Sequence, residues 1–228
     1  MPIVIILGLL LLVALIFGPQ FWVKQVIKKH ATHRDDLQGT GGELAEHLIE
    51  HYELNNVSVE ETNKGDHYDP ETRTVRLSPQ NFNGKSLSAV AIAAHEVSHA
   101  IQHMSGERLL SLRQRLVKFV MWTDRIAVIF FSLAPFLGVL TRAPAVFLLF
   151  TVIGFLFIAA RVAVQLITLP VEIDASFNKA LPILEQGGYL KSEDMPAARS
   201  VLKAAAMTYV AAALMSLIDI IRFARFGR

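Results

Sequence analysis

Residues 91–100 have the sequence AIAAHEVSHA, which contains the pattern HExxH at His95, Glu96 and His99. Residues four apart lie on one face of a helix, so His95 and His99 can direct ring nitrogens at a single metal ion. Glu96 lies beside them, close enough to take a proton from a water that the metal has acidified. The pattern therefore predicts a zinc site with His95 and His99 as ligands and Glu96 as the catalytic base.

The residues around this pattern predict one continuous helix. It is expected to begin at an N-cap at Ser86 or Ser88 and to run to about Met104, where Ser105 and Gly106 end it. Small alanines beside the histidines allow other elements to pack closely against it. The polar stretch 81–88 places the start of the helix in water, which disfavours an intramembrane protease.

Composition indicates a membrane protein whose metal ligands are histidine and carboxylate. Of 228 residues, 53% are hydrophobic and 18% charged, against about a quarter charged in a typical soluble domain. The net charge of +2 offers no broad basic surface, so nucleic acid is not an expected partner. The absence of cysteine excludes disulfides, thiolate metal sites and a cysteine nucleophile.

The first 23 residues are expected to form a transmembrane anchor. Residues 3–23 carry no charge and are long enough to cross a bilayer as a helix. They lack a basic leading region and a cleavage site, so we interpret them as a retained anchor and not as a signal peptide. The cations that follow are Lys24, Lys28, Lys29 and Arg34. By the positive-inside rule, they place the next segment in the cytoplasm.

Five parts are expected along this mainly α-helical chain. They are the anchor 1–23, a cytoplasmic zinc-binding catalytic domain 24–125, a transmembrane hairpin 126–165, a cytoplasmic segment 166–202, and a membrane or interfacial helix 203–228. In the hairpin, apolar runs at 126–140 and 145–160 flank a turn-forming break at 141–144. The last segment is left open, because Arg222 and Arg225 would lie outside if it spans.

The water-facing domain is predicted to contain a small β element and an amphipathic helix. Residues 57–62 and 72–78 are short segments that contain several β-branched side chains. The loop between them contains Gly65 and Pro70, so the whole region predicts a β-hairpin. The strand at 74–78 is either an ordinary structural strand or an edge strand that pairs with an extended peptide. Apolar residues at helical spacing predict a helix over 41–54, with Tyr52 in its buried stripe.

A second histidine pattern competes with the first. Residues 47–51, HLIEH, fit the inverted zinc pattern H-x-x-E-H. However, Leu44, Leu48 and Tyr52 form the buried stripe of that helix, and the polar residues lie largely elsewhere. We interpret His47, Glu50 and His51 as a solvated helix face.

The third metal ligand is predicted to be a carboxylate. All eight histidines lie within the range from His30 to His103. His103 lies one turn further along the same rigid helix, so it cannot bind the ion that His95 and His99 bind. Gln102 and Ser105 stand where an extended HExxH motif of the metzincin kind needs glycine and histidine.

Elimination among the carboxylates favours Glu172. Glu193 and Asp194 look like first-turn residues of a helix capped by Ser192, and Asp219 lies in an apolar stretch. Glu107 follows a turn and remains a weaker rival. Glu172 lies in segment 166–202, where a helix leaves the membrane hairpin, and a catalytic zinc usually has three protein ligands.

The pattern HExxH followed far downstream by E-x-x-A resembles the gluzincin arrangement of HtpX-type membrane proteases. More closely, the chain resembles the bacterial membrane neutral zinc metallopeptidase family typified by YugP. The likeness rests on the N-terminal anchor and on residues 67–70, 74–78, 93–102, 171–176 and 204–210. It implies a small α+β zincin-like catalytic domain, zinc peptidase activity in the bacterial plasma membrane, and Glu172 as third ligand. One departure is Ser176, which stands where many gluzincins have an aspartate that supports a zinc histidine; Asp174 is expected to face elsewhere.

These observations predict a membrane-anchored zinc endopeptidase that hydrolyses peptides or membrane proteins. Glu96 would act as base toward water and then as acid toward the leaving amine. The alternatives are an inactive zinc-bound scaffold that recruits other proteins, and a transporter, for which too few polar residues occur in the predicted spans. Donors to an oxyanion could be Tyr189, Arg199, Tyr209 or His67, and no spacing selects among them.

Overall fold

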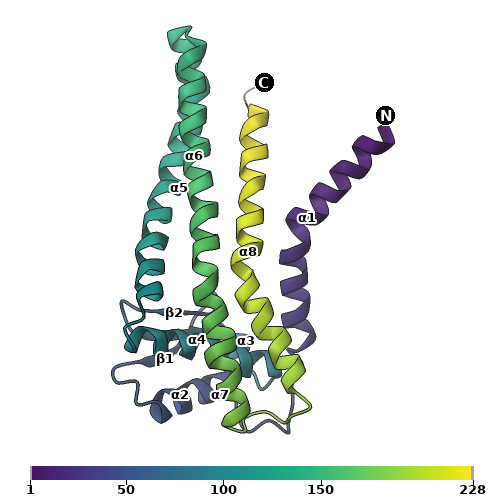
Figure 1. Ribbon diagram of the computed structural model, residues 1–228, viewed down its shortest axis with the longest axis vertical. Helices are drawn as coiled ribbons and strands as arrows, with labels where there is room; N and C mark the ends of the chain where they lie inside the picture. Colours follow the sequence, from purple (N-terminus) through teal and green to yellow (C-terminus); the bar gives the residue numbers. More distant parts are fainter. Residues whose placement is uncertain (1, 227–228) are drawn as a thin grey trace. The chain divides into compact units, whose positions relative to one another are not determined.

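The computed structural model describes the backbone of residues 2–226. Side chains are described in this range except at residues 2–5, 9, 121, 123–125, 127, 128, 131 and 216–226. The chain is mainly helical, as the sequence predicts, and has one three-stranded sheet (Figure 1).

The chain forms two compact units. The first comprises Met1–Gln20, Leu112–Leu169 and Tyr209–Arg228, and the second comprises Phe21–Ser111 and Pro170–Thr208. These units are defined by packing and not by position relative to a membrane. The five-part division expected from the sequence therefore stays a prediction.

The first unit contains a helical hairpin. Helix α5 (Arg108–Thr141) and helix α6 (Pro144–Ile173) are separated by two residues, which confirms the break predicted at 141–144. The two helices pack closely near the turn, where a Cβ on Gly138 would lie 2.9 Å from the Cβ of Phe147. Further along, the rings of Phe130 and Phe150 lie 5.0 Å apart.

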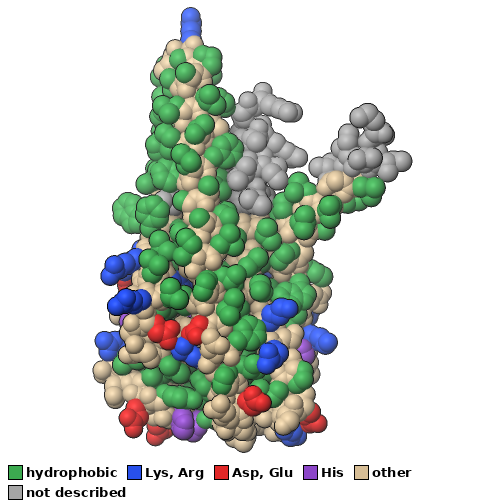
Figure 2. Space-filling model, viewed as in Figure 1, with side chains coloured by type: hydrophobic (Ala, Val, Ile, Leu, Met, Phe, Trp, Pro, Cys, Tyr) green, Lys and Arg blue, Asp and Glu red, His purple; other side chains and the backbone are tan. Residues whose placement is uncertain are grey.

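Two helical stretches in the described part of the chain are long and apolar enough to cross a membrane. They are Ile6–Lys29 in helix α1 (Pro2–Lys29) and the stretch that begins at Pro144. Their surfaces are mostly exposed, and Figure 2 shows hydrophobic side chains along the visible face of α6. These two stretches are identified by their length and composition alone. The four membrane segments expected from the sequence, including one within helix α8 (Met195–Phe226), remain a prediction.

The second unit is built around helix α4 (Leu87–Met104), which carries the HExxH pattern. Ser86 is its N-cap, because the hydroxyl of Ser86 accepts a hydrogen bond from the backbone N–H of Ala89 at 3.2 Å. Ser88, the other candidate, donates to the carbonyl of Ile27 at 2.7 Å. Almost every residue of α4 is buried, so neighbouring elements cover it on nearly all sides.

Helix α2 (Gly41–His51) packs against α4. It begins with a capping box in which Thr40 and Glu43 satisfy each other's backbone N–H groups. A Cβ on Gly41 would overlap backbone atoms of neighbouring segments, so glycine permits the close approach. The helix ends at His51, earlier than predicted. Tyr52 lies at its C-cap and is 40% exposed, so its place in the buried stripe was wrong.

The sheet corrects the predicted hairpin. Strands β1 (Ser58–Glu61) and β3 (Thr74–Leu77) pair in parallel, so they are not the two arms of a hairpin. The intervening residues contain a third strand, β2 (His67–Asp69), which pairs antiparallel with β3. The strand order is β1-β3-β2. Because β3 is the middle strand, it has no free edge, and the proposal that residues 74–78 pair with a peptide was wrong.

Arg76 of β3 joins all three strands. Its guanidinium donates to Asp69 of β2 at 2.6 Å and to Glu60 of β1 at 3.3 Å. Partial burial raises the pKa of Asp69, but the hydrogen bonds from Arg76, Glu71 and Thr72 together outweigh it and lower this pKa to about 2. The short sheet is thus held by a charged side chain in addition to its ladder.

Short helical elements complete the second unit. Helix α3 (Pro79–Phe82) precedes α4. After α6 the chain continues as a π-helix, η1 (Asp174–Ala180), and then as helix α7 (Leu181–Gln186). The element η1 packs directly against α4.

Candidate metal centre

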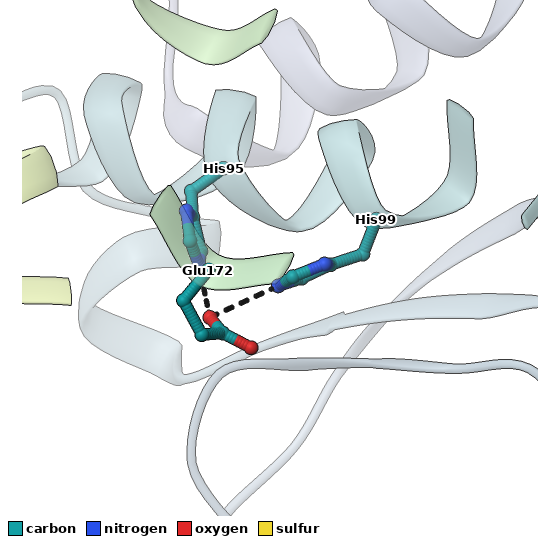
Figure 3. A group of neighbouring side chains, drawn as sticks. All are labelled: His95, His99 and Glu172. Carbon is teal, nitrogen blue, oxygen red and sulfur yellow. Dashed lines mark ion pairs between the residues drawn. The ribbon is translucent and has the colours of Figure 1, made fainter. Parts of the chain in front are cut away.

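Three buried side chains predicted from the sequence come together in the second unit. The Nε2 atoms of His95 and His99 each lie 3.3 Å from one carboxylate oxygen of Glu172. One potential ligand atom from each residue lies within 4.8 Å of the others. Figure 3 shows both imidazoles extending from the same helix toward this carboxylate. The three side chains are at most 5% exposed.

Local structure explains this convergence. His95 and His99 are one helical turn apart on α4, and their rings meet edge to face with centroids 4.8 Å apart. Ala91 and Ala94, both fully buried, leave room for a neighbouring element. Glu172 is the next-to-last residue of α6, and η1 begins two residues later. The packing of η1 on α4 therefore delivers the carboxylate to the two rings.

The donor set suits a zinc ion. Two imidazole nitrogens and one carboxylate oxygen are ligands that zinc takes in catalytic sites, where a fourth position stays open. A carboxylate this deeply buried costs free energy unless positive charge offsets it. A divalent cation between the three groups would supply that charge.

Each histidine is also contacted on its other ring nitrogen. The Nδ1 atom of His95 lies 3.0 Å from the hydroxyl of Ser176, and the Nδ1 atom of His99 lies 2.9 Å from the side-chain oxygen of Gln102. Asp174, which we expected to face elsewhere, accepts a hydrogen bond from the amide of Gln102 at 2.8 Å. No contact of Gln102 with His99 was predicted, although the two residues lie one helical turn apart on α4.

Glu96 lies between the two histidines on α4 and is 7% exposed. Its carboxylate forms no hydrogen bond or ion pair with any other residue that the structure describes. It is thus buried beside the candidate ligands without being held by another side chain.

The rival histidine pattern does not form a metal site. His47 and His51 are exposed, and His47 Nε2 lies 2.9 Å from the hydroxyl of Tyr189. Among the described residues, the group of His95, His99 and Glu172 is the only cluster of three such side chains that could hold a metal. The interpretation of His47, Glu50 and His51 as a solvated helix face is confirmed.

The rival carboxylates have other partners or positions. Glu107 forms an ion pair with Lys179 at 2.8 Å. Asp194 precedes Met195, the first residue of α8, and pairs with Arg34 at 3.1 Å. The prediction that Ser192 caps this helix, with Glu193 and Asp194 in its first turn, was therefore wrong. The side chain of Asp219 lies outside the described residues.

Three of the four oxyanion candidates lie in the second unit and have other contacts or are exposed. His67 Nδ1 contacts the carbonyl of Gly65, Tyr189 contacts His47, and Arg199 is exposed. Tyr209 belongs to the first unit, where Arg113 donates to its hydroxyl.

The sequence did not reveal a pair beside the metal-binding turn. The hydroxyl of Tyr68 on β2 lies 2.8 Å from Nδ1 of His103, which follows His99 by one helical turn. Burial, together with the charge of Arg73, lowers the pKa of His103, and burial raises the pKa of Tyr68.

Comparison with known proteins points to one family. Residues 3–227 match the family described as "Putative neutral zinc metallopeptidase". The chain is also similar to the "Putative membrane protease YugP" of Bacillus subtilis (strain 168), with 37% identity over 209 residues. That similarity covers 91% of this chain and 89% of the relative. No solved structure matches the chain.

Replacing Glu172 with alanine tests the third ligand. We expect Glu172→Ala to weaken zinc binding by more than about 100-fold, the upper end for changes to groups that only support a ligand. Zinc content and competition with a chromophoric chelator measure this on the purified protein in detergent. Glu193→Ala and Glu107→Ala should keep nearly full zinc. Full zinc in Glu172→Ala, or zinc loss in one of the other two alone, contradicts the assignment.

Proposed function

Because the chain belongs to the neutral zinc metallopeptidase family, we propose that it is a membrane-anchored zinc endopeptidase. In this proposal His95, His99 and Glu172 hold the zinc, and Glu96 is the catalytic base. The observation that carries the proposal is the buried cluster of two histidines and one glutamate on and beside the HExxH helix. Peptides or membrane proteins are the proposed substrates.

The arrangement assigns each side chain a separate task. When bound, zinc supplies a Lewis acid that acidifies water and polarises the peptide carbonyl. His95, His99 and Glu172 fill three positions of the ion, and burial keeps bulk water from competing for them. Glu96 takes the proton from the attacking water and delivers it to the leaving amine, so its carboxylate ends the reaction unprotonated.

The membrane part of the proposal rests on composition and on the relative. The two exposed apolar helical stretches support insertion in the bacterial plasma membrane, and the similar protein is named a membrane protease. We propose a multi-pass chain with the metal centre on the cytoplasmic side. Lys24, Lys28 and Lys29 at the end of α1 support this orientation.

Glu96→Gln separates chemistry from metal binding. We expect the variant to keep zinc, since Glu96 is not a ligand, and to lose about 10²- to 10⁴-fold in cleavage rate, the usual contribution of a general base. Hydrolysis of dye-quenched casein by the purified protein, measured together with zinc content, tests this.

The matched control is Glu50→Gln in the exposed H-x-x-E-H stretch, which should cleave like the parent. Equal cleavage by Glu96→Gln and the parent contradicts the mechanism. Bound zinc without cleavage by the parent would favour the inactive scaffold.

A single cysteine tests the orientation. The chain has no cysteine, and Asn63 lies exposed between β1 and β2, so Asn63→Cys gives one accessible thiol. In intact cells we expect this thiol to be protected from a membrane-impermeant maleimide, and after lysis to be labelled. The cysteine-free parent reports the background. Labelling of intact cells at the level of lysed cells would place the metal centre outside.

A further inference from the structure

The carboxamide of Gln102 is oriented by two acceptors. Gln102 is fully buried on α4, and its nitrogen donates to the carbonyl of Val171 at 3.1 Å and to Asp174 at 2.8 Å. The oxygen and nitrogen of such an amide are assigned from their partners. Because a carbonyl and a carboxylate can only accept, the nitrogen must face them. The oxygen of Gln102 therefore faces His99.

This orientation determines which nitrogen of His99 carries the proton. The oxygen of Gln102 can only accept a hydrogen bond, and Nδ1 of His99 lies 2.9 Å from it. Nδ1 must therefore be the N–H of the ring. A metal-binding imidazole is neutral and has one such proton, so Nε2 of His99 is the nitrogen left for the ion.

The same logic applies to His95. The hydroxyl of Ser176 is fully buried and has a single proton, which it donates to the carbonyl of Leu202 at 3.1 Å. Its oxygen is left to accept from Nδ1 of His95 at 3.0 Å. Nε2 of His95 is therefore also the nitrogen left for the ion.

Both contacts come from the π-helix that follows Glu172. In η1 the turns are wider, and the amide of Leu181 bonds to the carbonyl of Ser176 five residues back. Asp174 reaches Gln102 and also pairs with Lys179, while Ser176 still faces His95.

We propose that Gln102 and Ser176 are positioning residues that hold His99 and His95 as Nδ1–H tautomers. Both Nε2 atoms face the carboxylate of Glu172 and are the nitrogens that would bind the ion. The three side chains are thereby oriented for a cation. This proposal rests on the proposed zinc site and extends it to residues that do not touch the metal.

Two substitutions remove the two contacts separately. Gln102→Leu keeps approximate size but offers no acceptor to His99, and Ser176→Ala removes the hydroxyl beside His95. We expect each to weaken zinc binding about 10- to 100-fold, the usual cost of losing a group that orients a metal-binding histidine. Chelator competition measures this. The matched control is Ser98→Ala, because Ser98 is also fully buried and its hydroxyl also bonds to a helical carbonyl, yet it contacts neither ring.

A spectroscopic measurement separates positioning from general packing. The ¹⁵N chemical shifts of the histidine rings in the zinc-free protein distinguish the two neutral tautomers. In the parent and in Ser98→Ala both rings should be Nδ1–H. In Gln102→Leu the His99 signal should shift toward a mixture, and in Ser176→Ala the His95 signal should do so.

The outcomes are distinguishable from failure of the zinc site itself. Parent-like zinc affinity and tautomers in either folded variant overturn the proposal for that residue. If Gln102→Leu does not fold, Ser176→Ala carries the test, because it removes a single atom. Retention of zinc by Glu172→Ala would instead overturn the metal site on which the proposal rests.

Discussion

The convergence of two imidazole nitrogens on one buried carboxylate is the interaction on which this structure depends. His95 and His99 come from α4, and Glu172 comes from the end of α6, far away in the sequence. Bringing three such groups out of water is costly unless a cation joins them. The three groups are nevertheless buried in the second unit, where α2, the sheet and η1 pack around α4. The metal is thus expected to stabilise the packing that creates its own site.

Local features of this site could be predicted from the sequence because they depend on spacing along one helix. The four-residue separation of His95 and His99 fixes their common face, and Ser86 fixes where that helix begins. Glu172 could be proposed because the chain has no cysteine and no histidine beyond His103, and because the family resemblance implied it. These arguments need no knowledge of tertiary packing.

Features that depend on how segments pair were not predictable in the same way. The strand β2 is only three residues long, so no periodic pattern predicted it. Because β2 lies between them in the sequence, β1 and β3 pair in parallel and do not form the expected hairpin. Asp174 contacts Gln102, a residue of a different helix far away in the sequence, which spacing along one helix does not predict. In the sequence, Gln102 served to exclude the metzincin motif and contributed to the family resemblance, but neither use predicted its contacts. Its role depends on a contact with a segment about 70 residues away.

The most direct test of the central claim is the position of zinc in crystals of the protein, located by anomalous diffraction at the zinc absorption edge. The account predicts one strong peak about 2.0–2.2 Å from Nε2 of His95, Nε2 of His99 and a carboxylate oxygen of Glu172. A peak bound by His47 and His51, or one that reaches the two histidines of α4 without Glu172, would contradict it.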